Sequence, residues 1–169
     1  MFRQVALRVE ALLEVRLARN PEEVDAALRL RERVFAVEQG VRPEADRDGR
    51  DPEATHVVAV EDGRVLGTCR LVFQGDLARL GRMAVEQDMR GRGVGAAILR
   101  EAEHAAQGAG ARRISLHAQL PARSLYERDG YEQRGAEFVE EGIEHVTMEK
   151  AIEERSRGAG PASTGESGA

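Results

Sequence analysis

The sequence has few of the groups that disulfide or metal chemistry requires. Cys69 is its one cysteine, so no internal disulfide can form, and its four histidines are scattered along the chain. No group of these residues has the spacing of a metal site. We therefore expect no bound metal, and the near absence of cysteine favours a reducing, cytoplasmic location.

The chain also lacks long apolar runs and an excess of positive charge. No apolar run approaches the roughly 20 residues that a membrane-spanning helix needs. Residues 1–17 mix charged with apolar side chains, unlike the unbroken apolar centre of a secretory signal. The net charge is −5, and Lys150 is the only lysine among 25 basic residues. This composition excludes a general nucleic-acid binder and a membrane protein from the expected classes.

The composition that is present fits one globular domain. The 169 residues are 41% hydrophobic and 33% charged, as in ordinary soluble domains that bury a core. Gly, Ser, Pro and Thr dominate from Ser156 onward. We expect a single domain over residues 1–152 and a disordered tail over residues 153–169.

Turn and cap residues divide the domain into strands and helices. Asn20 and Glu23 form a capping-box pattern around Pro21, which predicts a helix that ends near Gly40. Asp-Gly and Gly-Asp pairs separate three strand-like runs. The pattern predicts strands over residues 13–18, 55–61, 64–74, 77–85, 114–118, 131–139 and 143–148, helices over residues 20–40, 94–108 and 121–128, and a loop over residues 41–52. The expected fold class is α+β with one central mixed sheet.

Three glycines alternate with other residues where a strand gives way to a helix, in the stretch Arg90, Gly91, Arg92, Gly93, Val94 and Gly95. Glycine allows a ligand to approach the backbone closely. The N-terminus of the following helix attracts anions, and the two arginines add forked donors suited to phosphate. The stretch predicts a seat for a diphosphate.

Two common nucleotide sites do not fit this context. A dinucleotide-binding fold places its glycines after a first strand, with an acidic residue about 20 positions further on. Here the glycines follow a run of hairpins in mid-chain, and Gly110 stands where the acid is expected. The Gly-Lys-Ser/Thr sequence of a P-loop is also missing.

The glycine stretch, with its neighbours, resembles the GNAT superfamily of acyl-CoA-dependent N-acetyltransferases, and in particular its ElaA/YjcF-like branch. Arg90, Gly93 and Gly95 match the superfamily motif Arg/Gln-x-x-Gly-x-Gly/Ala. Further similar stretches cover residues 31–39, 80–85, 117–119, 125–131 and 142–146. The resemblance implies a twisted, mostly antiparallel sheet with helices on both faces and two splayed parallel strands that form the acyl-CoA cleft.

The resemblance also implies where acetyl-CoA binds. The backbone of residues 83–85 would pair with the pantetheine arm, and the amides of residues 90–95 would hold the pyrophosphate. The implied cofactor-binding residues are Met83, Ala84, Val85, Arg90, Gly91, Arg92, Gly93, Val94, Gly95, Gln119 and Tyr126. Homodimers are common in the superfamily, so a homodimer is one expected assembly.

Tyr126 matches the superfamily tyrosine that protonates the departing CoA thiolate as a general acid. The strand over residues 77–85 has no acidic residue that could act as the base. Glu38 and His145 are the candidate bases, and His56 and His117 are weaker ones. For each of these four, a structural role is the competing interpretation.

The sequence thus predicts an N-acetyltransferase that moves acetyl from acetyl-CoA to a primary amine of a small molecule or peptide, by direct attack in a ternary complex. Transfer through Cys69 is disfavoured, because a small buried residue is the better interpretation of a cysteine on this strand. A non-catalytic acyl-CoA-binding protein is the alternative, and a phosphate-binding module is a third. Asp46, Asp48 and Asp51 either attract a cationic amine or form a solvated loop.

Overall fold

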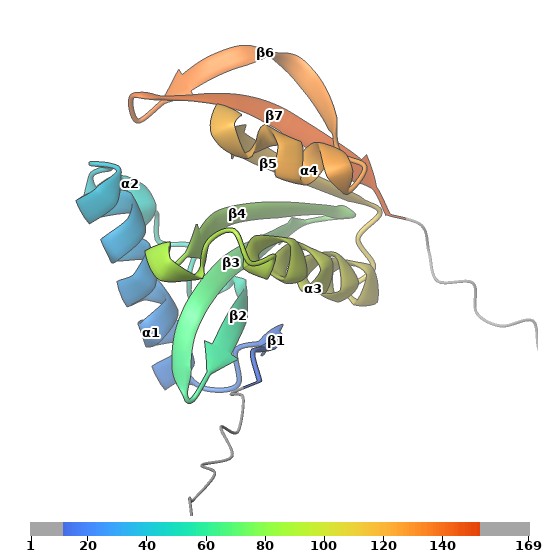
Figure 1. Cartoon of the computed structure of the whole chain (residues 1–169). Coiled ribbons are helices and arrows are strands. Elements are labelled where there is room, and N and C mark those ends of the chain that lie inside the picture. The colour runs from blue at the N-terminus through green and yellow to red at the C-terminus, as the bar shows by residue number, and fades with distance from the viewer. Residues whose placement is uncertain (1–11, 153–169) are drawn as a thin grey trace, which may run out of the picture.

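The computed structural model describes residues 12–152, and the predicted tail therefore lies outside the described residues. Seven strands form one sheet in the order β1-β2-β3-β4-β5-β7-β6 (Figure 1). Neighbouring strands are antiparallel except β4 and β5, which are parallel. The strands are β1 (Glu14–Leu17), β2 (Thr55–Glu61), β3 (Arg64–Gln74), β4 (Leu77–Val85), β5 (Arg113–Gln119), β6 (Glu132–Glu140) and β7 (Ile143–Ala151).

The main helices are α1 (Pro21–Arg31), α2 (Pro43–Asp46), α3 (Val94–Gly108) and α4 (Arg123–Arg128). At the start of α1, Asn20 accepts a hydrogen bond from the backbone N–H of Glu23, as the capping pattern predicts. The Glu23 carboxylate accepts from the backbone N–H of Arg19 instead of that of Asn20. None of the helices in residues 12–152 is long and apolar enough to cross a bilayer.

Two core layers cover opposite faces of the sheet. Along β2, Val57 and Ala59 belong to the core cluster that contains α3, whereas Val58 and Val60 belong to the cluster that contains α1. Because side chains alternate along a strand, this near-continuous apolar run is typical of a strand covered on both faces. Figure 1 shows α3 in front of β3 and β4, while β5, β7 and β6 gather with α4 in the upper part of the molecule.

A bulge in β4 changes which side chains face α3. Arg82 has a φ of +55°, and the register of β4 against β3 shifts between Thr68 and Arg70. Before the bulge, Ala78 and Leu80 pack in the α3 layer, and after it Met83 does so. The extra residue therefore turns the C-terminal half of β4 by one position.

The boundaries of most strands and the helix end near Gly40 follow the prediction, and one local prediction is wrong. Residues 41–52 are not all loop, because Pro43–Asp46 forms the short helix α2. Helix α1 passes into a π-helical segment, Glu32–Glu38, before it ends. There the N–H of Gln39 bonds the carbonyl of Val34 at 3.2 Å, and such segments are frequent at functional sites.

Candidate active site

Strands β4 and β5 separate halfway along their length. Residues 77–80 of β4 pair with residues 113–116 of β5, and the ladder then stops. Residues 81–85 and residues 117–119 continue without pairing to each other in the described sheet. Backbone N–H and C=O groups on these facing edges need partners, so an extended ligand can pair with them as an added strand.

A cavity of about 730 Å³ opens where the two strands separate. Its floor is the sheet face opposite α3: Arg70 and Val72 of β3, Arg79 and Gly81 of β4, and Ser115, His117 and Gln119 of β5. Four of the predicted site residues line it, namely Met83, Gln119, Tyr126 and His145. The volume lies in the range of cavities that hold small molecules and cofactors.

The glycine stretch forms a tight turn at the start of α3. Gly91 and Gly93 have φ values of +75° and +79°, which explains glycine at these two positions. Gly95 is helical, and a Cβ there would meet Leu125 at an ordinary 3.6 Å. Val94 is buried in the core, so only its backbone can face a ligand. The first N–H groups of α3 thus remain available for an anion.

Tyr126 is 5% exposed, and burial raises the pKa of its phenol above the usual value. Its ring packs edge to face on Tyr131, with ring centroids 5.8 Å apart. Tyr131 is a core residue, as predicted. A phenol with a raised pKa stays protonated at neutral pH, so Tyr126 keeps its O–H proton beside the cavity.

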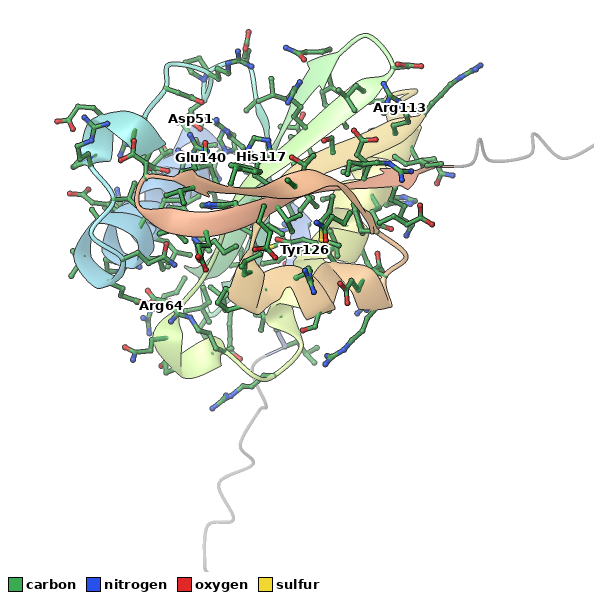
Figure 2. The ribbon with its side chains drawn as sticks, turned by 90° about the horizontal axis from the view of Figure 1, so that it is seen from above. Asp51, Arg64, Arg113, His117, Tyr126 and Glu140 are labelled. Carbon is green, nitrogen blue, oxygen red and sulfur yellow. The ribbon has the colours of Figure 1, made fainter. Side chains whose placement is uncertain are left out.

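Two histidines line the cavity, each with one nitrogen already occupied. His145 Nδ1 lies 2.7 Å from the carbonyl oxygen of Ile143, which can only accept, so Nδ1 carries the proton. His117 Nδ1 lies 3.1 Å from Oε2 of Glu140 (Figure 2). In the neutral form of either ring, a proton on Nδ1 leaves the lone pair of Nε2 available. His56 differs, because it is buried and its Nε2 contacts the carbonyl of Asp51.

Comparison with known proteins is consistent with this geometry. A family model described as an acetyltransferase (GNAT) domain matches residues 19–152. The chain belongs to the GNAT acetyltransferase family. It is therefore an acyltransferase, and the family uses acyl-CoA as its donor.

Similar proteins include members of the expected branch of the GNAT family. YjcF of Bacillus subtilis, described as an uncharacterized N-acetyltransferase, is 33% identical over 135 residues, which cover 79% of this chain and 96% of YjcF. The structure of an acyl-CoA N-acyltransferase from Pseudomonas aeruginosa is 27% identical, with a TM-score of 0.74. The match covers 83% of this chain and 100% of that one. Escherichia coli ElaA has the same fold, with 23% identity and a TM-score of 0.74. The match covers 82% of this chain and 99% of ElaA. The predicted fold and the ElaA/YjcF-like resemblance are confirmed.

The other predicted GNAT site residues lie outside the cavity lining. Glu38, a candidate base, accepts a hydrogen bond from Arg90 at 2.7 Å, and Arg90 also donates to the carbonyl of Val85 at 3.0 Å. Arg92 is exposed, and its guanidinium contacts the sulfur of Met89 at 3.9 Å. The structure therefore joins Glu38 to the glycine turn and does not place it among the residues that line the cavity. The lining also omits Ala84, Val85, Arg90, Gly91, Arg92, Gly93, Val94 and Gly95.

The acidic loop forms an ion network, and neither interpretation from the sequence describes it. Asp46 pairs with Arg31 and Arg82, and Asp51 pairs with Arg31 and Arg70. Asp46 is 6% exposed and Arg31 is 1% exposed, so this is no solvated loop. Since each of these aspartates already pairs with an arginine, none of the three offers an unpaired carboxylate to a cationic amine.

Asp48 completes this network through Arg70 and Arg82. The hydrogen bond from Arg70 holds the pKa of Asp48 well below its usual value, against the effect of burial. For Asp51, burial alone would raise the pKa, but the hydrogen bonds from Arg31 and Arg70 lower it. All three aspartates thus hold arginines beside the β4 bulge, and two of those arginines, Arg70 and Arg82, line the cavity.

The sequence disfavours acyl transfer through Cys69 and predicts no bound metal, and the structure bears on both points. Cys69 is 1% exposed, and burial raises the pKa of its thiol. A thiol of this kind is a poor nucleophile. Within residues 12–152 no group of three His, Cys, Asp or Glu side chains could hold a metal ion.

Proposed function

We propose that this GNAT protein transfers acetyl from acetyl-CoA to a primary amine by direct attack in a ternary complex. The observation that carries the proposal is one cavity that joins three features: the unpaired edges of β4 and β5, the protonated phenol of Tyr126, and the free Nε2 atoms of two histidines.

The donor would lie in the gap between β4 and β5. We infer that the backbone of Met83, Ala84 and Val85 pairs with the pantetheine arm and that Gln119 faces it from β5. The amides between Arg90 and Gly95 would hold the pyrophosphate, in line with the anion preference of a helix N-terminus. The left-handed conformations of Gly91 and Gly93 support this turn geometry.

The reaction needs one base and one acid. Nε2 of His145 would take the proton of the ammonium, directly or through water, so that the amine lone pair can attack the thioester carbonyl. The new C–N bond forms as the C–S bond breaks, and Tyr126 would donate its proton to the departing CoA thiolate. The nitrogen of the new amide would then lose its second proton, which returns through water to the Tyr126 phenolate. Nε2 of His117 is the second candidate base, because it lines the same cavity. Glu38 is a third, although its carboxylate already pairs with Arg90.

A Tyr126→Phe variant tests the acid role. Within residues 12–152 the Tyr126 hydroxyl has no hydrogen-bond partner whose loss would disturb the fold, and phenylalanine keeps the ring that packs on Tyr131. We expect kcat to fall by about 10²-fold with acetyl-CoA affinity unchanged, measured by thiol release over a panel of amines and by calorimetry.

The outcomes separate the enzyme from the non-catalytic alternative. Acetyl-CoA binding without thiol release for any amine would support an acyl-CoA-binding protein. Equal turnover by Tyr126→Phe and wild type would exclude the acid role. Failure to bind acetyl-CoA at micromolar concentration would reject the proposed function altogether.

A further inference from the structure

Some charged residues of the cavity lining form ion pairs within the described part of the protein, and others do not. Arg70 and Arg82 pair with Asp48, and Arg82 also pairs with Asp46. On the opposite wall Glu141 pairs with Arg42, which lies outside the lining. These ion pairs leave little net charge for a ligand to meet.

Two other arginines of the cavity lining have no such ion pair with a described residue. Arg50 and Arg79 both line the cavity, and within residues 12–152 no carboxylate pairs with either guanidinium. Arg79 donates its Nε–H to the neutral amide oxygen of Gln74 at 2.9 Å. It lies on the floor, opposite Ser115 in the ladder between β4 and β5. The cavity lining therefore carries two positive charges that no carboxylate of the described residues compensates.

The lining also carries a carboxylate, that of Glu140, which has no cationic partner among the described residues when His117 is neutral. Glu140 contacts His117 Nδ1 at 3.1 Å, and its side chain is 50% exposed. The nearby guanidinium of Arg42 pairs with Glu141, and the described residues give Glu140 no arginine or lysine partner. The cavity is thus positive at Arg50 and Arg79 and negative at Glu140.

We propose that the acceptor is a primary amine that also carries an anionic group, a carboxylate or a phosphate. Its anion binds Arg50 and Arg79, and its ammonium is drawn to the Glu140–His117 pair, beside the histidines that can accept its proton. This inference deepens the proposed function and rests on it. The charge pattern complements a zwitterion and disfavours a polycationic amine.

The cavity floor is open next to Arg79. Gly81 lies there, and a Cβ at this position would meet nothing within 4 Å. Its φ is not in the left-handed region, so neither backbone strain nor packing requires glycine. The missing side chain leaves room in which an acceptor can reach from Arg79 to His117.

The charge preference can be measured on products, which bind without turnover. The probes are N-acetylglycine against N-acetylglycinamide, and N-acetylphosphoethanolamine against N-acetylethanolamine. Within each pair the anionic group is the main difference, so the two pairs separate a carboxylate from a phosphate. We expect the anionic member of at least one pair to bind about fivefold tighter or more, by calorimetry with and without CoA.

The double variant Arg50→Gln/Arg79→Gln should reduce that preference to within about twofold, because the remaining arginines are already paired. Arg64→Gln is the matched control: Arg64 is an exposed arginine that does not line the cavity, and it lies apart from His117 and Glu140 in Figure 2. It should keep the full preference.

Equal binding within both pairs would overturn the inference, as would a preference that survives the double variant. Either result leaves acetyl-CoA binding and thiol release intact and does not affect the proposed function. Loss of CoA binding and of all thiol release, with the anion preference retained, would instead reject the proposed function.

Discussion

Replacing Arg31 by methionine tests whether the buried ion network stabilises the protein. Arg31 is 1% exposed and bonds Asp46 through Nε and Asp51 through Nη1 and Nη2. The variant keeps most of the side-chain volume and removes the charge. It leaves two mostly buried carboxylates with fewer partners.

The magnitude follows from what each carboxylate retains. Removing one partner of a buried ion pair costs about 3–5 kcal/mol. Asp46 keeps Arg82 at 3.1 Å and Asp51 keeps Arg70 at 3.2 Å, so we expect the lower end, about 3 kcal/mol. For a domain of this size each kcal/mol shifts Tm by roughly 2–4 °C, so Tm should fall by about 6–12 °C.

Urea and thermal unfolding followed by circular dichroism measure this loss. Arg29→Met is the control, because Arg29 is an exposed arginine on the same helix; it should change the stability by less than about 0.5 kcal/mol. If Arg31→Met unfolds with the same midpoint as Arg29→Met, the network does not stabilise the fold, and the reasoning fails.

Two further predictions concern packing and pH. In Gly67→Ala the new Cβ would lie 2.6 Å from Cδ1 of the buried Ile98, so we expect a loss of about 1–3 kcal/mol. The cost should shrink in an Ile98→Val background, which lacks that atom; an equal cost in both backgrounds would contradict the close contact. Burial, followed by a hydrogen bond to Asp129, raises the pKa of Glu103 from 4.5 to about 7. The folded state therefore holds this proton more tightly than the unfolded state, so the stability it contributes is complete below about pH 4.5 and is lost as pH rises through 7. Glu103→Gln should flatten the fall in Tm between pH 5 and 8, and an unchanged slope would contradict the assignment.

Local patterns in the sequence predicted much of the sheet. The three strands over residues 55–61, 64–74 and 77–85 have the predicted bounds, because Asp62-Gly63 and Gly75-Asp76 supply the turns between them. The glycine turn before α3 could also be predicted from the sequence, because Gly91 and Gly93 adopt backbone conformations that few other residues tolerate. Asn20 begins α1 through a bond to a residue three positions away. All these signals act over a few residues.

The cavity depends on contacts between residues that lie far apart in the sequence, and local patterns do not predict such contacts. Arg31 meets Asp51 twenty positions away, and His117 meets Glu140 only after β6 and β7 fold back beside β5. The sequence showed Arg31 as an exception on an apolar helix face, and the alternation of Ser115, His117 and Gln119 could have indicated a shared face. Neither pattern indicates which residue these side chains contact.

The amino-acid sequence by itself determined the family, the order of the elements and the glycine turn, because turn, cap and periodicity signals are local. The tertiary structure decided which charges remain free. Whether an aspartate attracts a ligand or neutralises an arginine depends on what the sheet brings beside it. That pairing occupied Asp46, Asp48 and Asp51 and left Arg50 and Arg79 unpaired within the described residues.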